Sequence, residues 1–77
     1  MEENTTFLIH LLIARLERIS ADSLWAHRAS GVKGSLLRMM AKSEKGYPIR
    51  QVDLNQTIEL GFSILEKAAK EKDSPSS

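Results

Sequence analysis

The sequence predicts an all-α fold, a small three-helix bundle, from two observations. Apolar residues recur at the three- and four-residue spacing of an amphipathic helix in three successive segments. Short stretches with capping or helix-breaking residues join these segments, and short connections favour antiparallel neighbours. We expect helices at roughly 5–19, 24–45 and 53–72, in a single helical domain over residues 1–72 followed by a disordered tail at 73–77.

The first helix should begin at Asn4 or Thr5, because either side chain can cap the first exposed amides. Its main apolar stripe consists of Leu8, Ile9, Leu12, Ile13, Leu16 and Ile19. A second apolar flank is formed by Phe7, Leu11 and Ala14. A helix that is apolar around most of its circumference is expected to be central in its bundle or shared with another subunit.

The second helix has one apolar face and two glycines in its middle. The face comprises Trp25, Ala29, Val32, Leu36, Met39 and Met40. Gly31 and Gly34 each cost roughly 1 kcal/mol relative to alanine in a helix interior. Because the apolar phase continues across them, we expect one helix, straight or bent, that stops at Gly46. The alternative is a pair of helices split at Gly31–Gly34.

The third helix follows a loop at Tyr47 and Pro48, because proline disfavours helical geometry at the residue before it. Asp53 is the expected start, with Gln56 as its capping-box partner, and Pro48 is an alternative first helical residue. The apolar face comprises Leu54, Ile58, Phe62, Leu65 and Ala69, widened by Leu60, Ile64 and Ala68.

Apolar surface exceeds what a three-helix bundle requires on the first and third helices. A chain of 77 residues also has a marginal core, since it buries only roughly 60% of its unfolded surface. We therefore expect a homodimer that forms through the apolar surface of the first or third helix.

The composition narrows the compartment and the partners. Eleven basic and ten acidic residues leave a net charge of +1, which gives no general support to nucleic-acid or membrane binding. The absence of cysteine excludes disulfides and thiolate metal sites and fits a reducing compartment. The apolar run Phe7–Ile13 is far shorter than the roughly 20 residues of a membrane span. We expect a cytoplasmic protein with no membrane partner.

Catalytic and metal-binding patterns are weak. His10 would share a helix face with Thr6 and Glu17, but no oxyanion donor lies nearby in the sequence. The segment 30–35 has phosphate-loop residue types without the GxxxxGK[ST] order, and no HxxxH or CxxC spacing occurs. We expect no enzyme activity, catalytic residue, metal or cofactor.

One side of the second helix is the candidate face for a partner or nucleic acid. On a continuous helix this side holds His27, Gly31, Gly34, Arg38, Lys42 and Lys45, and Arg28 completes the candidate set. Small residues let another backbone or a phosphate approach closely, and basic residues supply phosphate contacts. Tight helix packing at the glycines, within the chain or across a dimer, is one interpretation, and a merely solvated basic face is another.

The leading functional hypothesis is a non-enzymatic interaction module or adaptor that self-associates. The alternative is a small nucleic-acid-binding protein that uses the four cations Arg28, Arg38, Lys42 and Lys45. A split at Gly31–Gly34 would give helix-turn-helix proportions, although the second half would then begin with apolar Leu36 and Leu37.

Two cations lie against apolar stripes. Arg15 on the first helix and Lys33 on the second either extend to solvent or meet a carboxylate of the third helix, such as Glu59 or Glu66.

Overall fold

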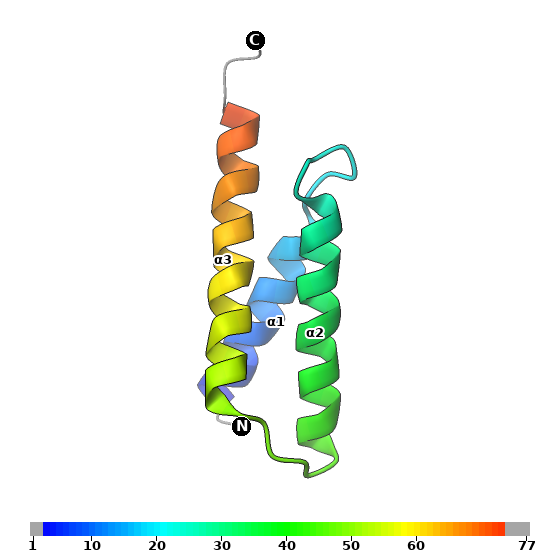
Figure 1. The fold of residues 1–77 in the computed structure, drawn as a ribbon, viewed down its shortest axis with the longest axis vertical. Coiled ribbons are helices and arrows are strands. Elements are labelled where there is room, and N and C mark those ends of the chain that lie inside the picture. The colour runs from blue at the N-terminus through cyan, green and yellow to red at the C-terminus, as the bar shows by residue number, and fades with distance from the viewer. Residues whose placement is uncertain (1–2, 74–77) are drawn as a thin grey trace.

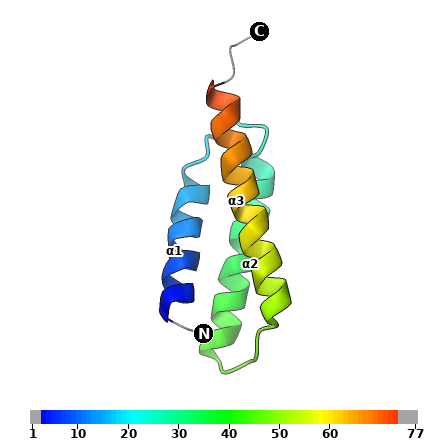
Figure 2. The same ribbon diagram turned by 90° about the vertical axis from the view of Figure 1, so that its left-hand side faces the viewer.

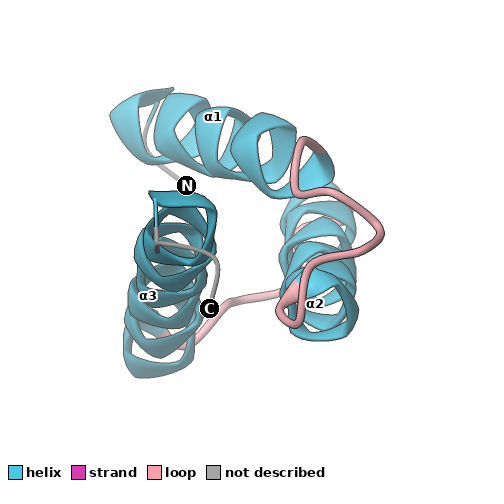
Figure 3. Cartoon of the chain, turned by 90° about the horizontal axis from the view of Figure 1, so that it is seen from above, coloured by secondary structure: helices cyan, strands magenta, loops and turns pink. Residues whose placement is uncertain are grey.

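The computed structural model describes residues 3–73, with side chains from 3 to 71, as three helices: α1 (Glu3–Glu17), α2 (Ala26–Glu44) and α3 (Gln51–Asp73). α2 and α3 run antiparallel, and α1 crosses behind them (Figure 1). Seen from above, α1 covers one side of the α2–α3 pair (Figure 3). The predicted all-α three-helix bundle is confirmed.

The helix ends differ from the expected ones by about one half-turn. The expected cap at Asn4 or Thr5 is wrong, because α1 already includes both residues. α1 stops at Glu17 rather than Ile19, and α2 starts at Ala26 rather than residue 24. Ser23 Oγ accepts the Trp25 backbone N–H at 3.1 Å, which holds the chain in a turn before α2. Asp73 belongs to α3, and the rest of the expected tail, 74–77, lies outside the described residues.

The expected capping box at Asp53 and Gln56 is wrong, because α3 begins two residues earlier, at Gln51. The backbone N–H of Leu54 already donates to the Arg50 carbonyl at 3.1 Å, so the first turn forms before Asp53. Asp53 instead lies 4.0 Å from the Arg50 guanidinium and stands in the acidic first turn that suits the helix dipole.

α2 is continuous through both glycines, so the split at Gly31–Gly34 is wrong. Ala29, Val32 and Leu36 are all buried, which shows that one apolar face spans the glycines. Burial of this face supplies the stabilisation that offsets the poor helix propensity of glycine. The helix-turn-helix arrangement that the split would have created is therefore absent from α2.

The end of α2 confirms the predicted stop at Gly46. Gly46 has φ of 87°, in the left-handed region that favours glycine. The Tyr47 N–H donates to the Lys42 carbonyl and the Gly46 N–H to the Ser43 carbonyl, both at 3.0 Å. These two bonds form a Schellman motif, which satisfies the last carbonyls and turns the chain towards α3.

The core draws on all three helices, and α1 contributes most. Its buried apolar residues are Ile9, Leu12, Ile13, Leu16, Ala29, Val32, Leu36, Leu54 and Ile64. Trp25, expected on the apolar face, is partly buried against this core. The second apolar flank of α1 faces solvent instead, with Phe7 69% exposed.

Gly61 of α3 lies directly against Leu12 of α1. It is buried, and a Cβ added to it would lie 2.8 Å from Leu12 Cδ2 and 3.2 Å from Leu12 Cγ. Leu12 is fully buried and occupies the space that a side chain on α3 would fill. Gly61 thus lets the two helices pack closely, a role that sequence analysis did not assign to it.

The link between α1 and α2 is hydrogen-bonded to the C-terminal end of α3. The Leu24 backbone N–H donates to the Glu71 carboxylate at 3.3 Å, and Ser23 Oγ donates to it at 3.4 Å. The Trp25 ring lies 5.6 Å from the Arg28 guanidinium carbon and 5.0 Å from Lys67 Nζ. α3 continues past the end of α1 at this end of the bundle (Figure 2).

Candidate partner-binding surface

Six of the seven predicted surface residues belong to α2, and the seventh, Lys45, is its C-cap. All are exposed except Gly34, which is half-buried. Four of them are cations, and we call this set the basic strip: Arg28, Arg38, Lys42 and Lys45. At 1.5 Å rise per residue, the strip extends over roughly 25 Å.

The basic strip carries no neutralising carboxylate among the described residues. Arg38 donates from Nη2 to Ser35 Oγ at 3.2 Å, and Arg28 lies against the Trp25 ring. The ion pairs of the described chain lie elsewhere: Lys33–Glu17 at 3.8 Å, Arg50–Asp53 at 4.0 Å and Lys70–Glu66 at 3.0 Å. The basic strip is therefore a positive surface whose charges are not paired with carboxylates of the described chain.

The two boundary cations behave differently from each other. Lys33 pairs with Glu17 of α1, not with Glu59 or Glu66 of α3. Arg15 is exposed and pairs with no carboxylate in the described part of the chain, so it extends to solvent as one of the two expected alternatives.

A groove lies between α2 and α3, and Arg28 of the basic strip is one of its lining residues. Its volume is about 470 Å³, and we call it the α2–α3 groove. It is lined by Arg28, Gly31, Val32, Ser35, Thr57, Leu60 and Ile64. None of these lining residues belongs to α1, which covers the other side of the helix pair (Figure 3).

The groove is open at the middle of its α2 wall because Gly31 has no side chain there. Nothing lies within 4 Å of the position that a Cβ on Gly31 would take. At Gly34 the nearest such atom is Arg38 Nη1, at 3.5 Å. Neither glycine is a point of close helix packing within the chain, which was one of the interpretations, whereas Gly61 of α3 is. Most of the exposed apolar surface of the groove belongs to Leu60 of α3, which is 49% exposed, because Val32 and Ile64 are buried.

The weak histidine pattern of α1 can be placed in the structure. His10 is exposed, and the Glu17 carboxylate that would orient it is near Lys33. Among residues 3–71, no group of three or more His, Cys, Asp or Glu side chains is placed to hold a metal ion. None of the helices described here has the length and apolar character needed to cross a membrane.

No family model, curated protein or solved structure matches this chain. Its function is therefore inferred from its surfaces.

Proposed function

We propose that the protein is a non-enzymatic interaction module whose α2–α3 groove binds an acidic amphipathic helix of a partner protein. The observation that carries the proposal is an open, partly apolar groove that is lined by Arg28 and is followed along α2 by three more cations, none of the four paired with a carboxylate of the described chain.

The groove supplies the apolar half of the recognition. Val32, Leu60 and Ile64 line it with aliphatic side chains, and Gly31 lets a guest backbone approach α2 closely. A helix laid between α2 and α3 on the side away from α1 would complete a four-helix arrangement, in which each pair of neighbours buries apolar surface.

The basic strip supplies the charged half. A guest helix that continues past the groove towards the C-terminal end of α2 would present one flank to Arg38, Lys42 and Lys45, all of which are exposed. Carboxylates on that flank would be attracted at long range and would set the orientation of the helix. An acidic guest is thus favoured over a neutral or basic one.

A protein partner is favoured over nucleic acid. The continuous α2 lacks the turn that would present a recognition helix, and Leu37 on its exposed side offers no polar group to a base edge. Phosphate contacts by the basic strip alone remain the basis of the nucleic-acid alternative, which the same experiment tests.

Fluorescence anisotropy with three labelled probes tests the proposal. The probes are a designed amphipathic peptide with a leucine stripe and a glutamate flank, the same peptide with its stripe scrambled, and a duplex DNA. The test variants are Gly31→Leu, which fills the groove, and the pair Arg38→Glu and Lys42→Glu, which reverses the strip. Ala41→Leu, at an exposed α2 position outside the groove, is the matched control.

We expect the acidic amphipathic peptide to bind the natural chain and the Ala41→Leu variant alike. Gly31→Leu should abolish this binding, and the charge reversal should weaken it and remove its salt dependence. Equal binding of the scrambled peptide, or no binding of either peptide, would contradict the proposal. The nucleic-acid alternative predicts DNA binding in which the logarithm of the binding constant falls with the logarithm of the salt concentration. A slope of about −4, the value for four or five phosphate contacts, would establish it instead.

The homodimer also remains a prediction. Phe7 and Leu11 of α1 and Phe62 of α3 are exposed and would supply its interface. Sedimentation at several concentrations measures the oligomeric state, and a lone 8.6 kDa species with a stable cooperative melt would contradict it. The cytoplasmic location is likewise a prediction that imaging of a tagged chain would check.

A further inference from the structure

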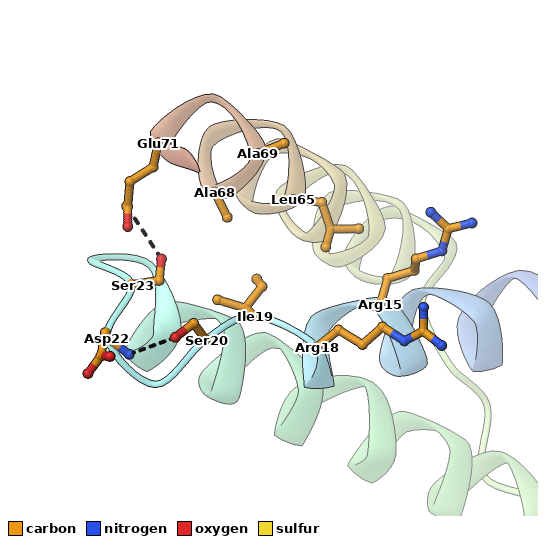
Figure 4. Close-up of a pocket in the computed structure, with 10 residues that line it drawn as sticks. All are labelled: Arg15, Arg18, Ile19, Ser20, Asp22, Ser23, Leu65, Ala68, Ala69 and Glu71. Carbon is orange, nitrogen blue, oxygen red and sulfur yellow. Dashed lines mark hydrogen bonds between the residues drawn. The ribbon is translucent and has the colours of Figure 1, made fainter. Parts of the chain in front are cut away.

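A second pocket lies at the end of the bundle where α1 stops and α3 continues. It has a volume of about 560 Å³, within the roughly 300–1,000 Å³ of small-molecule sites. We call it the end pocket. Its lining residues, labelled in Figure 4, come from α1, the α1–α2 link and α3.

The middle of the end pocket is apolar. Ile19 and Leu65 are partly buried and pack against the core, and Ala68 and Ala69 continue the same surface along α3. This surface is accessible because the chain leaves the helical path after Glu17, so no further turn of α1 covers the last part of α3. Ile19 lies opposite Leu65 and Ala68 in Figure 4.

The charges of the pocket are separated between its two ends. Figure 4 shows the guanidinium groups of Arg15 and Arg18 at one end and the carboxylates of Asp22 and Glu71 at the other. The Glu71 carboxylate already accepts hydrogen bonds from the α1–α2 link. Both guanidinium groups, by contrast, lie outside the ion pairs found among residues 3–71.

This arrangement has the polarity of an amphiphile site. We propose that the end pocket binds a single-chain anionic amphiphile of the fatty-acid class. The carboxylate pairs with Arg15 and Arg18, which can each form two parallel hydrogen bonds to such a group. The hydrocarbon chain lies over Ile19, Leu65 and the two alanines, whose surface it removes from water.

The proposal is independent of the α2–α3 groove, because no residue lines both pockets. Its test uses the full isotope-labelled chain and NMR titration with decanoate below its micelle concentration. Decyltrimethylammonium, decanol and inorganic phosphate are the comparison ligands. Decyltrimethylammonium has the same hydrocarbon chain with a positive charge, decanol has the chain without a charge, and inorganic phosphate is an anion without a chain.

We expect saturable shifts from decanoate at the backbone amides of Ile19, Leu65 and Ala69. The double variant Arg15→Gln, Arg18→Gln should weaken decanoate by at least about tenfold, since it removes charge-assisted hydrogen bonds. The control Arg38→Gln, Arg50→Gln removes the same charge away from the pocket and should leave binding unchanged. Ala69→Leu, at an exposed position, should block the hydrocarbon chain without disturbing the core.

Four results would overturn the proposal. Decanoate could fail to saturate, or the cationic amphiphile could bind as tightly as decanoate. Inorganic phosphate could displace decanoate at equal concentration, which would make the site a simple anion site. The shifts could also centre on the exposed residues Phe7 and Leu11, which would indicate nonspecific adsorption to the outer face of α1.

Discussion

The two long contacts of α3 use glycine in opposite ways. Against α1, Gly61 removes a side chain so that the fully buried Leu12 can fill the space, and the contact is closed. Beside the contact between α3 and α2, Gly31 of α2 also lacks a side chain, but no atom lies within 4 Å of the position that its Cβ would take. The same residue type therefore makes a core contact on one side of α3 and leaves a groove on the other. The second arrangement leaves room for an external partner.

Leu12→Ala should have the largest effect on this comparison. Leu12 is fully buried, and its removal leaves a cavity against α3, so we expect a loss of about 2–5 kcal/mol in the free energy of unfolding. Chemical denaturation measures it. Leu60→Ala, at the half-exposed wall of the groove, is the control and should lose less than about 1 kcal/mol. Similar losses for the two variants would show that the closed and open contacts do not differ.

Gly61→Ala should destabilise the fold by a smaller amount. The new Cβ would lie 2.8 Å from Leu12 Cδ2, and Leu12 is too well packed to move freely. Overpacking costs about 1–3 kcal/mol, and the better helix propensity of alanine offsets roughly 1 kcal/mol of it. Combined with Leu12→Ala, the substitution should cost less than the sum of the two. A gain in stability from Gly61→Ala alone would contradict the close contact.

Glu71→Gln tests the hydrogen bonds that join the α1–α2 link to the C-terminal end of α3. The amide still accepts one hydrogen bond but loses the charge that strengthens the bond from the Leu24 N–H. We expect a loss of roughly 1 kcal/mol, together with faster amide exchange at Leu24. Glu66→Gln, which breaks only the exposed pair with Lys70, should lose less than about 0.5 kcal/mol. An unchanged rate of amide hydrogen exchange at Leu24 would contradict the hydrogen bond between Leu24 and Glu71.

Gly31→Ala should have the smallest effect, and of the opposite sign. Its Cβ meets nothing, so the helix gains about 0.5–1 kcal/mol from the better propensity of alanine. Gly34→Ala should gain a similar amount, since its nearest neighbour is the mobile Arg38 side chain at 3.5 Å. The extra methyl at position 31 also narrows the groove, so binding of the acidic peptide should weaken while the melting temperature rises. A lower melting temperature for Gly31→Ala would show that the groove is closed.

The sequence was sufficient for the fold class because each helix carries its own apolar period. It was also sufficient for the continuity of α2, since Ala29, Val32 and Leu36 stay in phase across the glycines. The start of α3 was misplaced because Asp53 suits both an N-cap and a first turn.

The sites were harder to predict because they depend on how the helices pair. Nothing local distinguishes Gly61 from Gly31; only the position of Leu12 on another helix does. The basic strip was found from its spacing along one helix. The α2–α3 groove and the end pocket were missed, because their walls come from segments far apart in the chain.

The most direct test of the proposed binding surface is an amide shift map of the isotope-labelled chain titrated with the acidic amphipathic peptide. The account predicts the largest shifts at Gly31, Ser35, Thr57 and Leu60, with smaller ones along the basic strip. The largest shifts at Phe7, Leu11 and Phe62, or no shifts at all, would contradict it.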